Sequence, residues 1–221
     1  MKTKMNSFGV IGLGRFGMAI AQYLAEAGKD VMIVDQKEEK VQELRHLTEY
    51  AFVVERLTRQ TLEEIGIQNC DTVIIGIGEK IDTSILTTLN VVALGVPRVI
   101  AKAINRDHGT ILEMLGVEVV FPERDMALYM GRYLIFNGFL DFISLNNNME
   151  IQQFSVTDSM VGISVEELDV RQKYGLNIIA IGQEHTTDIE VSPKYRFRKG
   201  DSITAIGKVE NFKRLVADIE S

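Results

Sequence analysis

A glycine-rich turn near the N-terminus constrains the fold of this chain more than any other feature. The apolar run FGVI at residues 8–11 leads into GLGRFG at 12–17, which has the spacing GxGxxG and opens a helical pattern. In such a turn the first glycine permits a tight bend, the second lets the backbone approach a phosphate, and the third lets helix and strand pack closely. Asp35 ends the next apolar run, where a carboxylate accepts hydrogen bonds from ribose hydroxyls. The pattern predicts an adenine-nucleotide site; the alternative is a glycine turn that only packs the sheet.

Short apolar runs alternate with helical patterns through the first two-thirds of the chain. The runs lack polar alternation, as expected for strands that are covered on both faces. This β-α-β series predicts an α/β fold, a Rossmann-like doubly wound parallel sheet with its ligand at the carboxyl ends of the strands. The predicted strands are 8–11, 31–34, 51–54, 73–77, 98–101 and 118–121, and the predicted helices between them are 16–27, 37–47 and 82–94.

The pattern changes after Pro122. Residues 123–138 are typical of a helix that is apolar around most of its circumference, and such a helix needs cover on all sides. We therefore expect a crossover helix that packs against a second chain; the alternative is a helix wedged between two domains of one chain. Three asparagines at 146–148 predict a linker. The predicted domains are a nucleotide-binding domain at 1–143, which includes this helix, and a small domain at 148–221.

The small domain is expected to be α+β. Its helix at 164–173 separates the first two strands, and a turn at Gly200-Asp201 precedes the last strand. The predicted elements are strands at 149–156, 176–182, near 187–191 and 201–206, with helices at 164–173 and 208–219.

Composition excludes several classes of protein. The 221 residues carry a formal net charge of −7 at pH 7, which disfavours a nucleic-acid partner. The one cysteine, Cys70, rules out an intramolecular disulfide framework and fits a reducing compartment. No secretory apolar core and no run long enough to span a membrane is present. We expect a cytoplasmic protein that reaches a membrane only through a partner.

Residues suited to catalysis are scarce. The three histidines lie in polar or charged segments, where we expect surface residues rather than general bases, and no GxSxG, HExxH or CxxC motif is present. A dehydrogenase needs an acid or base facing the nicotinamide. The sequence favours a binding protein that is not an enzyme; the alternative is an NAD-dependent oxidoreductase or an NAD(H)-responsive redox sensor. A transcriptional repressor would need a basic DNA-reading helix, which is not apparent. The histidines are His46, His108 and His185.

Three charged residues are expected on the ligand side of the sheet. Arg15 opens the helix after the glycine turn and either binds a phosphate or is a solvated surface arginine. Lys102 ends a strand and either neutralises phosphate or is solvated. Glu123 follows another strand, where it either holds a divalent cation beside phosphates or is a helix N-terminal acid.

Four segments resemble the cytoplasmic regulatory subunits of bacterial Ktr/Trk-type potassium uptake systems, which are built from RCK domains. They are GVIGLGRFGMAIAQYLAEAGKDVMIVD at 9–35, IGEKIDTSILTTLNVVALGVPRVIAKAIN at 77–105, FPERD at 121–125 and DVRQKYGLNIIAIG at 169–182. The KtrA/KtrC branch is most similar. The resemblance implies dimers that assemble into an octameric ring on the inner face of the membrane, docked on a potassium-translocating subunit. In this family ATP favours transport and ADP favours the inactive ring.

The resemblance also implies residue roles. It places phosphates on the glycine turn and Arg15, and ribose on Asp35. It places Glu123 near the terminal phosphate of a neighbouring subunit's nucleotide, with Mg or Ca as a bridge. It implies a cyclic di-AMP site in the small domain. The predicted nucleotide-binding residues are Gly12, Gly14, Arg15, Phe16, Gly17, Asp35, Lys102 and Glu123; the predicted cyclic di-AMP residues are Arg171, Asn177, Ile178 and Pro193.

One segment departs from the family pattern. After the third strand the family shows an Asn/Asp-Ala-Thr segment near the adenine, whereas this chain has VERLT at 54–58. Glu55 replaces the amide or short acid, and Arg56 and Leu57 are bulkier. The departure leaves the nucleotide preference open.

Overall fold

The computed structural model describes residues 6–135, 139–145, 148–184 and 186–219. Its internal contacts divide the chain into two compact units, Met1–Met126 and Ala127–Ser221. Within the described residues, no helix combines the length and apolar character needed to cross a membrane.

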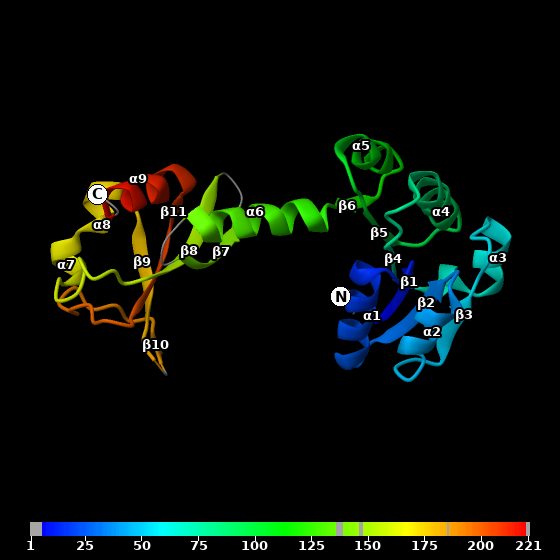
Figure 1. Ribbon diagram of the computed structural model, residues 1–221, viewed down its shortest axis with the longest axis horizontal. Helices are drawn as coiled ribbons and strands as arrows, with labels where there is room; N and C mark the ends of the chain where they lie inside the picture. Colours follow the sequence, from blue (N-terminus) through cyan, green and yellow to red (C-terminus); the bar gives the residue numbers. More distant parts are fainter. Residues whose placement is uncertain (1–5, 136–138, 146–147, 185, 220–221) are drawn as a thin grey trace. The chain divides into compact units, whose positions relative to one another are not determined.

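A six-stranded parallel sheet forms the centre of the first unit (Figure 1). Its order is β3-β2-β1-β4-β5-β6, so the chain builds outward from β1 on one side and then from β4 on the other. β4 is buried along its whole length, as expected for a central strand that is covered on both faces. The strands are β1 (Ser7–Ile11), β2 (Asp30–Asp35), β3 (Tyr50–Val53), β4 (Thr72–Ile75), β5 (Arg98–Lys102) and β6 (Glu118–Val120).

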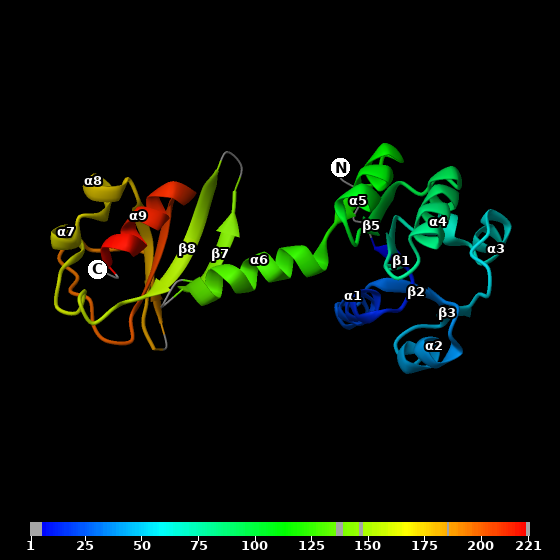
Figure 2. The ribbon, with the colours of Figure 1, turned by 45° about the horizontal axis from the view of Figure 1, so that its top comes forward.

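Helices cover both faces of this sheet (Figure 2). Val41 of α2 packs in one core with Ile74 of β4, whereas Leu62 of α3 and Leu112 of α5 pack in the other core with Val73 of the same strand. Alternate residues of one strand thus enter opposite cores, which is the pleat of a doubly wound sheet. The helices are α1 (Arg15–Glu26), α2 (Glu38–Leu44), α3 (Arg59–Glu64), the short 3₁₀ helix η1 (Ile67–Asn69), α4 (Ile81–Ala93) and α5 (Arg106–Met114).

The doubly wound fold expected from the sequence is confirmed, and all six predicted strands are present. The sequence did not predict α3 or α5. It also placed His108 in a polar turn at the surface, and that prediction is wrong. His108 lies in the first turn of α5 and is 1% exposed.

The second unit is built on a five-stranded antiparallel sheet of order β10-β9-β11-β8-β7. α8 and α9 pack on it, with Phe212 and Leu215 of α9 in a core that includes Ile203 and Leu176. This is the small α+β domain expected from the sequence. Its elements are β7 (Phe139–Ser144), β8 (Met149–Ser155), α7 (Val165–Leu168), α8 (Val170–Tyr174), β9 (Asn177–Gly182), β10 (Thr187–Asp188), β11 (Ser202–Lys208) and α9 (Val209–Ile219).

Two features differ from the sequence-based picture of this unit. The predicted domain boundary put residues 139–143 in the first domain, whereas β7 pairs with β8 in the second sheet. The predicted helix at 164–173 is two short helices, because Asp169 has a left-handed backbone with φ of +50° and ends α7.

The helix α6 (Pro122–Ile135) crosses the division between the two units in sequence. Its apolar side chains are largely uncovered in the single chain: Met126 and Leu128 are each 60% exposed and Leu134 is 74% exposed. Among the apolar side chains of α6 that the structure describes, Tyr129 is half-buried, since its ring stacks on Phe142 of β7 with centroids 5.8 Å apart.

Candidate functional site

Three glycines meet at the carboxyl ends of β1 and β4, where the strand order changes direction. Gly12 has φ of +92°, and a Cβ there would lie 2.8 Å from Ile77. A Cβ on Gly76 would lie 2.6 Å from the carbonyl oxygen of Gly12, and one on Gly17 would collide with that same oxygen. Only hydrogen side chains fit this junction, so it fixes the turn that leads into α1. Such a switch point is where ligands bind in open α/β sheets.

The N-terminus of α1 is suited to a phosphate. Its N-cap, Gly14, has extended backbone and no side chain to cap the first N–H groups, and no acid lies in the first turn. A Cβ on Gly14 would have no neighbour within 4 Å, so the backbone faces open space. Backbone N–H groups and the helix dipole at such an end favour an anion.

Asp35 is tied to the same turn. Its Oδ2 accepts a hydrogen bond from the Leu13 N–H at 2.6 Å, and its Oδ1 accepts one from the Lys37 N–H at 2.9 Å. Lys40 Nζ lies 3.9 Å from Asp35 Oδ2, and Asp35 is 8% exposed. The carboxylate predicted to bind ribose therefore also holds the glycine turn against β2.

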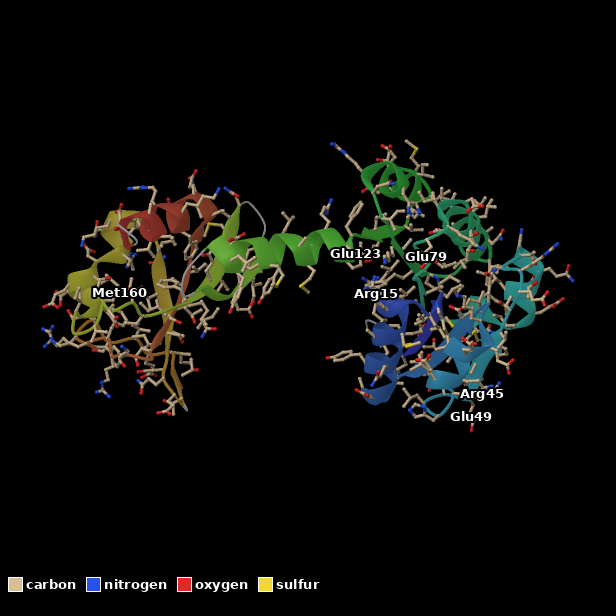
Figure 3. The ribbon with its side chains drawn as sticks, viewed as in Figure 1. Arg15, Arg45, Glu49, Glu79, Glu123 and Met160 are labelled. Atoms are coloured by element: carbon tan, nitrogen blue, oxygen red, sulfur yellow. The ribbon has the colours of Figure 1, made fainter. Side chains whose placement is uncertain are left out.

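Charged residues gather beside the glycine turn. Lys102 Nζ lies 2.5 Å from Glu123 Oε1 and 6.0 Å from the centre of the Phe16 ring. The hydrogen bond from Lys102, aided by the positive charge of Arg15, holds the pKa of Glu123 below its usual value. Figure 3 labels Arg15 and Glu123 near this edge of the sheet, together with Glu79 from the loop after β4. The predicted residues Arg15, Phe16, Lys102 and Glu123 are thus neighbours in the structure.

The fit of this cluster to a divalent cation is incomplete. Among the described residues, no group of three or more His, Cys, Asp or Glu side chains could hold a metal ion. One oxygen of Glu123 is bonded to Lys102. Glu123 alone does not make a cation site in one chain, because Mg²⁺ and Ca²⁺ need several oxygen ligands.

The loop that departs from the family pattern keeps a fixed backbone. Gln36 Nε2 donates to the carbonyl oxygen of Glu55 at 2.8 Å, and Asn90 Nδ2 donates to that of Leu57 at 3.0 Å. Thr58 caps α3. The side chains of Glu55 and Arg56 are exposed. The substitutions therefore change what the loop presents to a ligand, while side chains elsewhere anchor its backbone.

The four residues predicted to bind cyclic di-AMP lie in three segments of the second unit. Arg171 is exposed on α8, and Asn177 is exposed where β9 begins. Ile178 is half-buried and packs against the core, so a packing role accounts for part of its position. Pro193 is exposed in the loop before β11, and its carbonyl oxygen accepts from the Glu166 N–H at 2.9 Å.

The remaining titratable candidates that the structure describes lie in separate segments of the first unit. His46 is exposed, and His185 lies outside the described residues. The buried His108 accepts from the Ile104 N–H at 3.5 Å through Nδ1, and burial lowers its pKa. Cys70 is buried, and burial together with the charge of Asp71 raises its pKa to about 11, which keeps the thiol protonated and unreactive.

Known proteins are similar in sequence to this chain over nearly its whole length. A family model described as the TrkA-N domain matches residues 8–123, and one described as the TrkA-C domain matches residues 151–219. Ktr system potassium uptake protein C of Bacillus subtilis (strain 168) is 36% identical over 210 residues, which cover 94% of each chain. The chain belongs to the Ktr-type potassium uptake protein family.

Solved structures support the fold of this Ktr-type chain. The GsuK channel is similar over 97% of the chain, with a TM-score of 0.67 and 17% identity, and the match covers 39% of that channel chain. A structure of GsuK bound to ADP matches 60% of this chain and 35% of its own, with a TM-score of 0.50 and 26% identity.

Sequence reasoning missed two features of the sheet edge that carries the glycine turn in this Ktr-type chain. Gly76 completes the glycine junction, and the signal was a glycine near the end of an otherwise apolar strand pattern. The Lys102–Glu123 ion pair was also missed, although both residues were predicted at the same edge.

Proposed function

We propose that this chain is a regulatory subunit of a Ktr potassium uptake system, senses ATP and ADP at the glycine turn, and is not an enzyme. The observation that carries the proposal is the uncapped N-terminus of α1 beside the cluster of Arg15, Lys102 and Glu123. This edge offers backbone N–H groups and two cations to phosphates. The structure of GsuK bound to ADP supports an adenine nucleotide as the ligand.

The proposed mechanism is a shift between two states of a ring of subunits. A nucleotide drives such a shift only by the difference in its affinity for the two states. The third phosphate of ATP would supply that difference in two ways. It would bind Arg15, and it would draw the Lys102 ammonium away from Glu123. Moving the equilibrium from mostly closed to mostly open takes about 5.5 kcal/mol. Several subunits that contribute about 1 kcal/mol each would suffice, which favours a homo-oligomer such as an octamer.

The same proposal covers the partners and the location. The ring would act in the cytoplasm on a membrane potassium-translocating subunit. A divalent cation, Mg or Ca, would need phosphate oxygens and a second chain beside Glu123. Cyclic di-AMP would bind the second unit at Arg171, Asn177, Ile178 and Pro193, where a guanidinium suits phosphate and an apolar surface suits a base.

Calorimetric titration of the purified chain with ATP, ADP, NADH and cyclic di-AMP, each with and without Mg or Ca, tests the proposal. We expect different affinities for ATP and ADP, and saturable cyclic di-AMP binding that is lost in Arg171→Ala while ATP binding is kept. Tight NADH binding with negligible ATP and cyclic di-AMP binding would overturn the proposal and favour an NAD(H)-responsive redox protein.

A further inference from the structure

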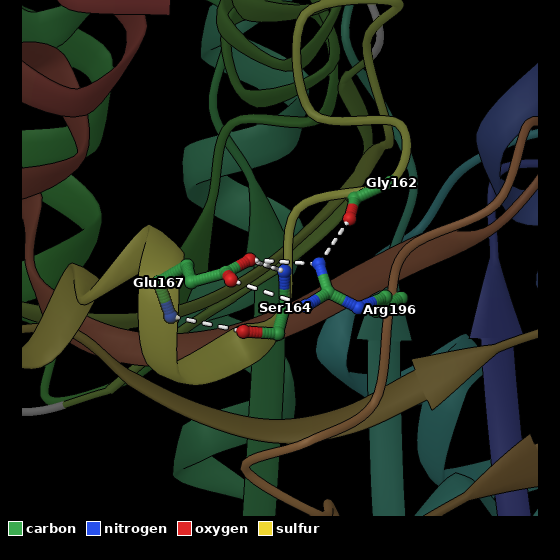
Figure 4. Close-up of polar contacts among 4 residues, drawn as sticks. All are labelled: Gly162, Ser164, Glu167 and Arg196. Carbon is green, nitrogen blue, oxygen red and sulfur yellow. Dashed lines mark hydrogen bonds and ion pairs between the residues drawn. The ribbon is translucent and has the colours of Figure 1, made fainter.

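One arginine side chain ties the loop that carries Pro193 to the segment that begins α7 (Figure 4). Arg196 Nη1 donates to the carbonyl oxygen of Gly162 at 2.7 Å and to Glu167 Oε2 at 2.9 Å. Its Nη2 donates to Glu167 Oε1 at 3.2 Å. The guanidinium therefore makes a bidentate contact to a carboxylate and a further bond to the backbone, which fixes both distance and orientation.

The carboxylate in this contact is itself held in place. The Ser164 N–H donates to Glu167 Oε2 at 2.8 Å, and the Glu167 N–H donates to Ser164 Oγ at 3.2 Å. This capping box fixes the start of α7. The capping box therefore fixes the orientation in which Glu167 presents its carboxylate to Arg196.

Backbone hydrogen bonds run beside the ion pair. The Glu166 N–H donates to the Pro193 carbonyl oxygen at 2.9 Å, and the Val165 N–H donates to that of Tyr195 at 3.0 Å. Through Asp169, α7 leads directly into α8, which carries Arg171. The position of Pro193 is therefore coupled to the helix pair that positions Arg171.

We propose that Arg196 and Glu167, here called the loop clamp, are positioning residues that hold Pro193 in register with Arg171 for a cyclic dinucleotide. This inference rests on the proposed function of the second unit. The clamp need not touch the ligand, because a loop that is already ordered loses less conformational entropy on binding. The two side chains are 61% and 53% exposed, so the clamp contributes little to overall stability and its effect falls on ligand affinity.

The test is a double-mutant cycle on cyclic di-AMP affinity in the full chain, measured by calorimetry. The variants are Arg196→Ala, Glu167→Gln and the double variant; a glutamine at 167 keeps the capping box but removes the charge. We expect each single change to weaken binding by about twofold to fivefold, and the double variant to lose no more than either single one. Arg196→Lys should recover only part of the affinity, because lysine cannot make the bidentate contact.

A matched control lies in the same loop. Lys199→Ala removes an ion pair to Asp158 whose side chains are 85% and 89% exposed, and it should leave cyclic di-AMP affinity unchanged. ATP affinity and the thermal midpoint should stay at the wild-type values in every variant. If Arg196→Ala fails to fold, Arg196→Lys and Glu167→Gln carry the same test.

The outcomes separate the two proposals. A wild-type chain that does not bind cyclic di-AMP overturns the proposed ligand of the second unit and the clamp with it. A wild-type chain that binds, with single variants of unchanged affinity, overturns the clamp alone. Losses that add in the double variant would show that the two residues act independently and would also overturn it.

Discussion

Under the proposed function, single charges beside the glycine turn would decide which nucleotide is preferred. The Lys102 ammonium is bonded to Glu123, while Arg15 lies near enough to lower the pKa of that carboxyl group. A ligand phosphate at this cluster would compete with Glu123 for Lys102 and would gain a second cation in Arg15. In the proposed site, the number of phosphates on the ligand would therefore matter more here than at the backbone N–H groups of α1, which a diphosphate would already engage.

Arg15→Ala is expected to weaken ATP by about tenfold and ADP by much less, because a charge-assisted hydrogen bond to the last phosphate is lost. Calorimetric titration with both nucleotides measures the difference. Arg45→Ala is the matched control, since Arg45, labelled in Figure 3, is exposed after α2. Its guanidinium donates a hydrogen bond to the carbonyl oxygen of Ala51. Equal losses for ATP and ADP would contradict the role given to Arg15.

His108 makes the free energy of unfolding sensitive to acid. Burial lowers its folded-state pKa below 6.5, so the unfolded chain binds more protons once the pH falls under that value. Stability is therefore lost as the pH drops through this window. Urea unfolding at pH 5.5 and 7.5 should show a larger drop for wild type than for His108→Gln. An identical drop would refute the assignment, and His46→Gln, at an exposed site, is the control.

At the scale of elements, the sequence predicted strands better than short helices. The strands of the first unit are continuous apolar runs, and burial on both faces makes that signal strong. α3 has six residues, too few for a helical period to repeat, and α5 contains a glycine and polar residues in its first turns. β7 was missed because Asp141 interrupts its apolar residues, so the segment shows neither a continuous apolar run nor strict alternation. The break at Asp169 depends on one left-handed residue, which no periodicity reveals.

The candidate site was predictable where it depends on local geometry. Gly12, Gly14 and Gly17 lie where the turn motif requires them, and Asp35 lies at the end of β2. The contact between Lys102 and Glu123 needed the order of β5 and β6 in the sheet, which local sequence does not contain.

Gly76→Ala is expected to destabilise the first unit by about 1–3 kcal/mol, because the added methyl group overpacks the glycine junction. Its Cβ would lie 2.6 Å from the Gly12 carbonyl oxygen and 3.3 Å from the Gly17 Cα. Urea unfolding measures the change. Gly131→Ala in α6, where a Cβ meets no atom within 4 Å, should be neutral or stabilising. Equal stability of the two variants would contradict the packing argument.

Across the whole molecule, each unit has its own apolar core, yet the segment between them in sequence leaves large apolar side chains exposed. Met126, Leu128, Met130, Tyr133 and Leu134 of α6 are between 44% and 74% exposed. A patch of this kind on a single chain marks an association surface. This exposure agrees with the prediction that α6 packs against a second copy, which stays a prediction.

Leu134→Glu is expected to shift the chain from dimer toward monomer, because a carboxylate would be buried without a partner in the interface. Sedimentation velocity measures the association state. Met114→Glu on α5 is the control, since Met114 is 80% exposed and lies outside α6. An unchanged dimer in Leu134→Glu would remove α6 as the dimer surface.

Asp35 has both structural contacts and a predicted ligand contact, so a substitution there cannot separate the two. Its carboxylate holds the Leu13 N–H while it is also the predicted ribose acceptor, so Asp35→Ala would loosen the turn and delete a ligand contact together. Chemistry on the nucleotide can separate the two effects. The wild-type chain, whose turn is intact, should bind the 2′,3′-dideoxy analogue of ATP about fivefold to tenfold more weakly than ATP. Equal affinities for the two nucleotides would mean that Asp35 only holds the turn in place.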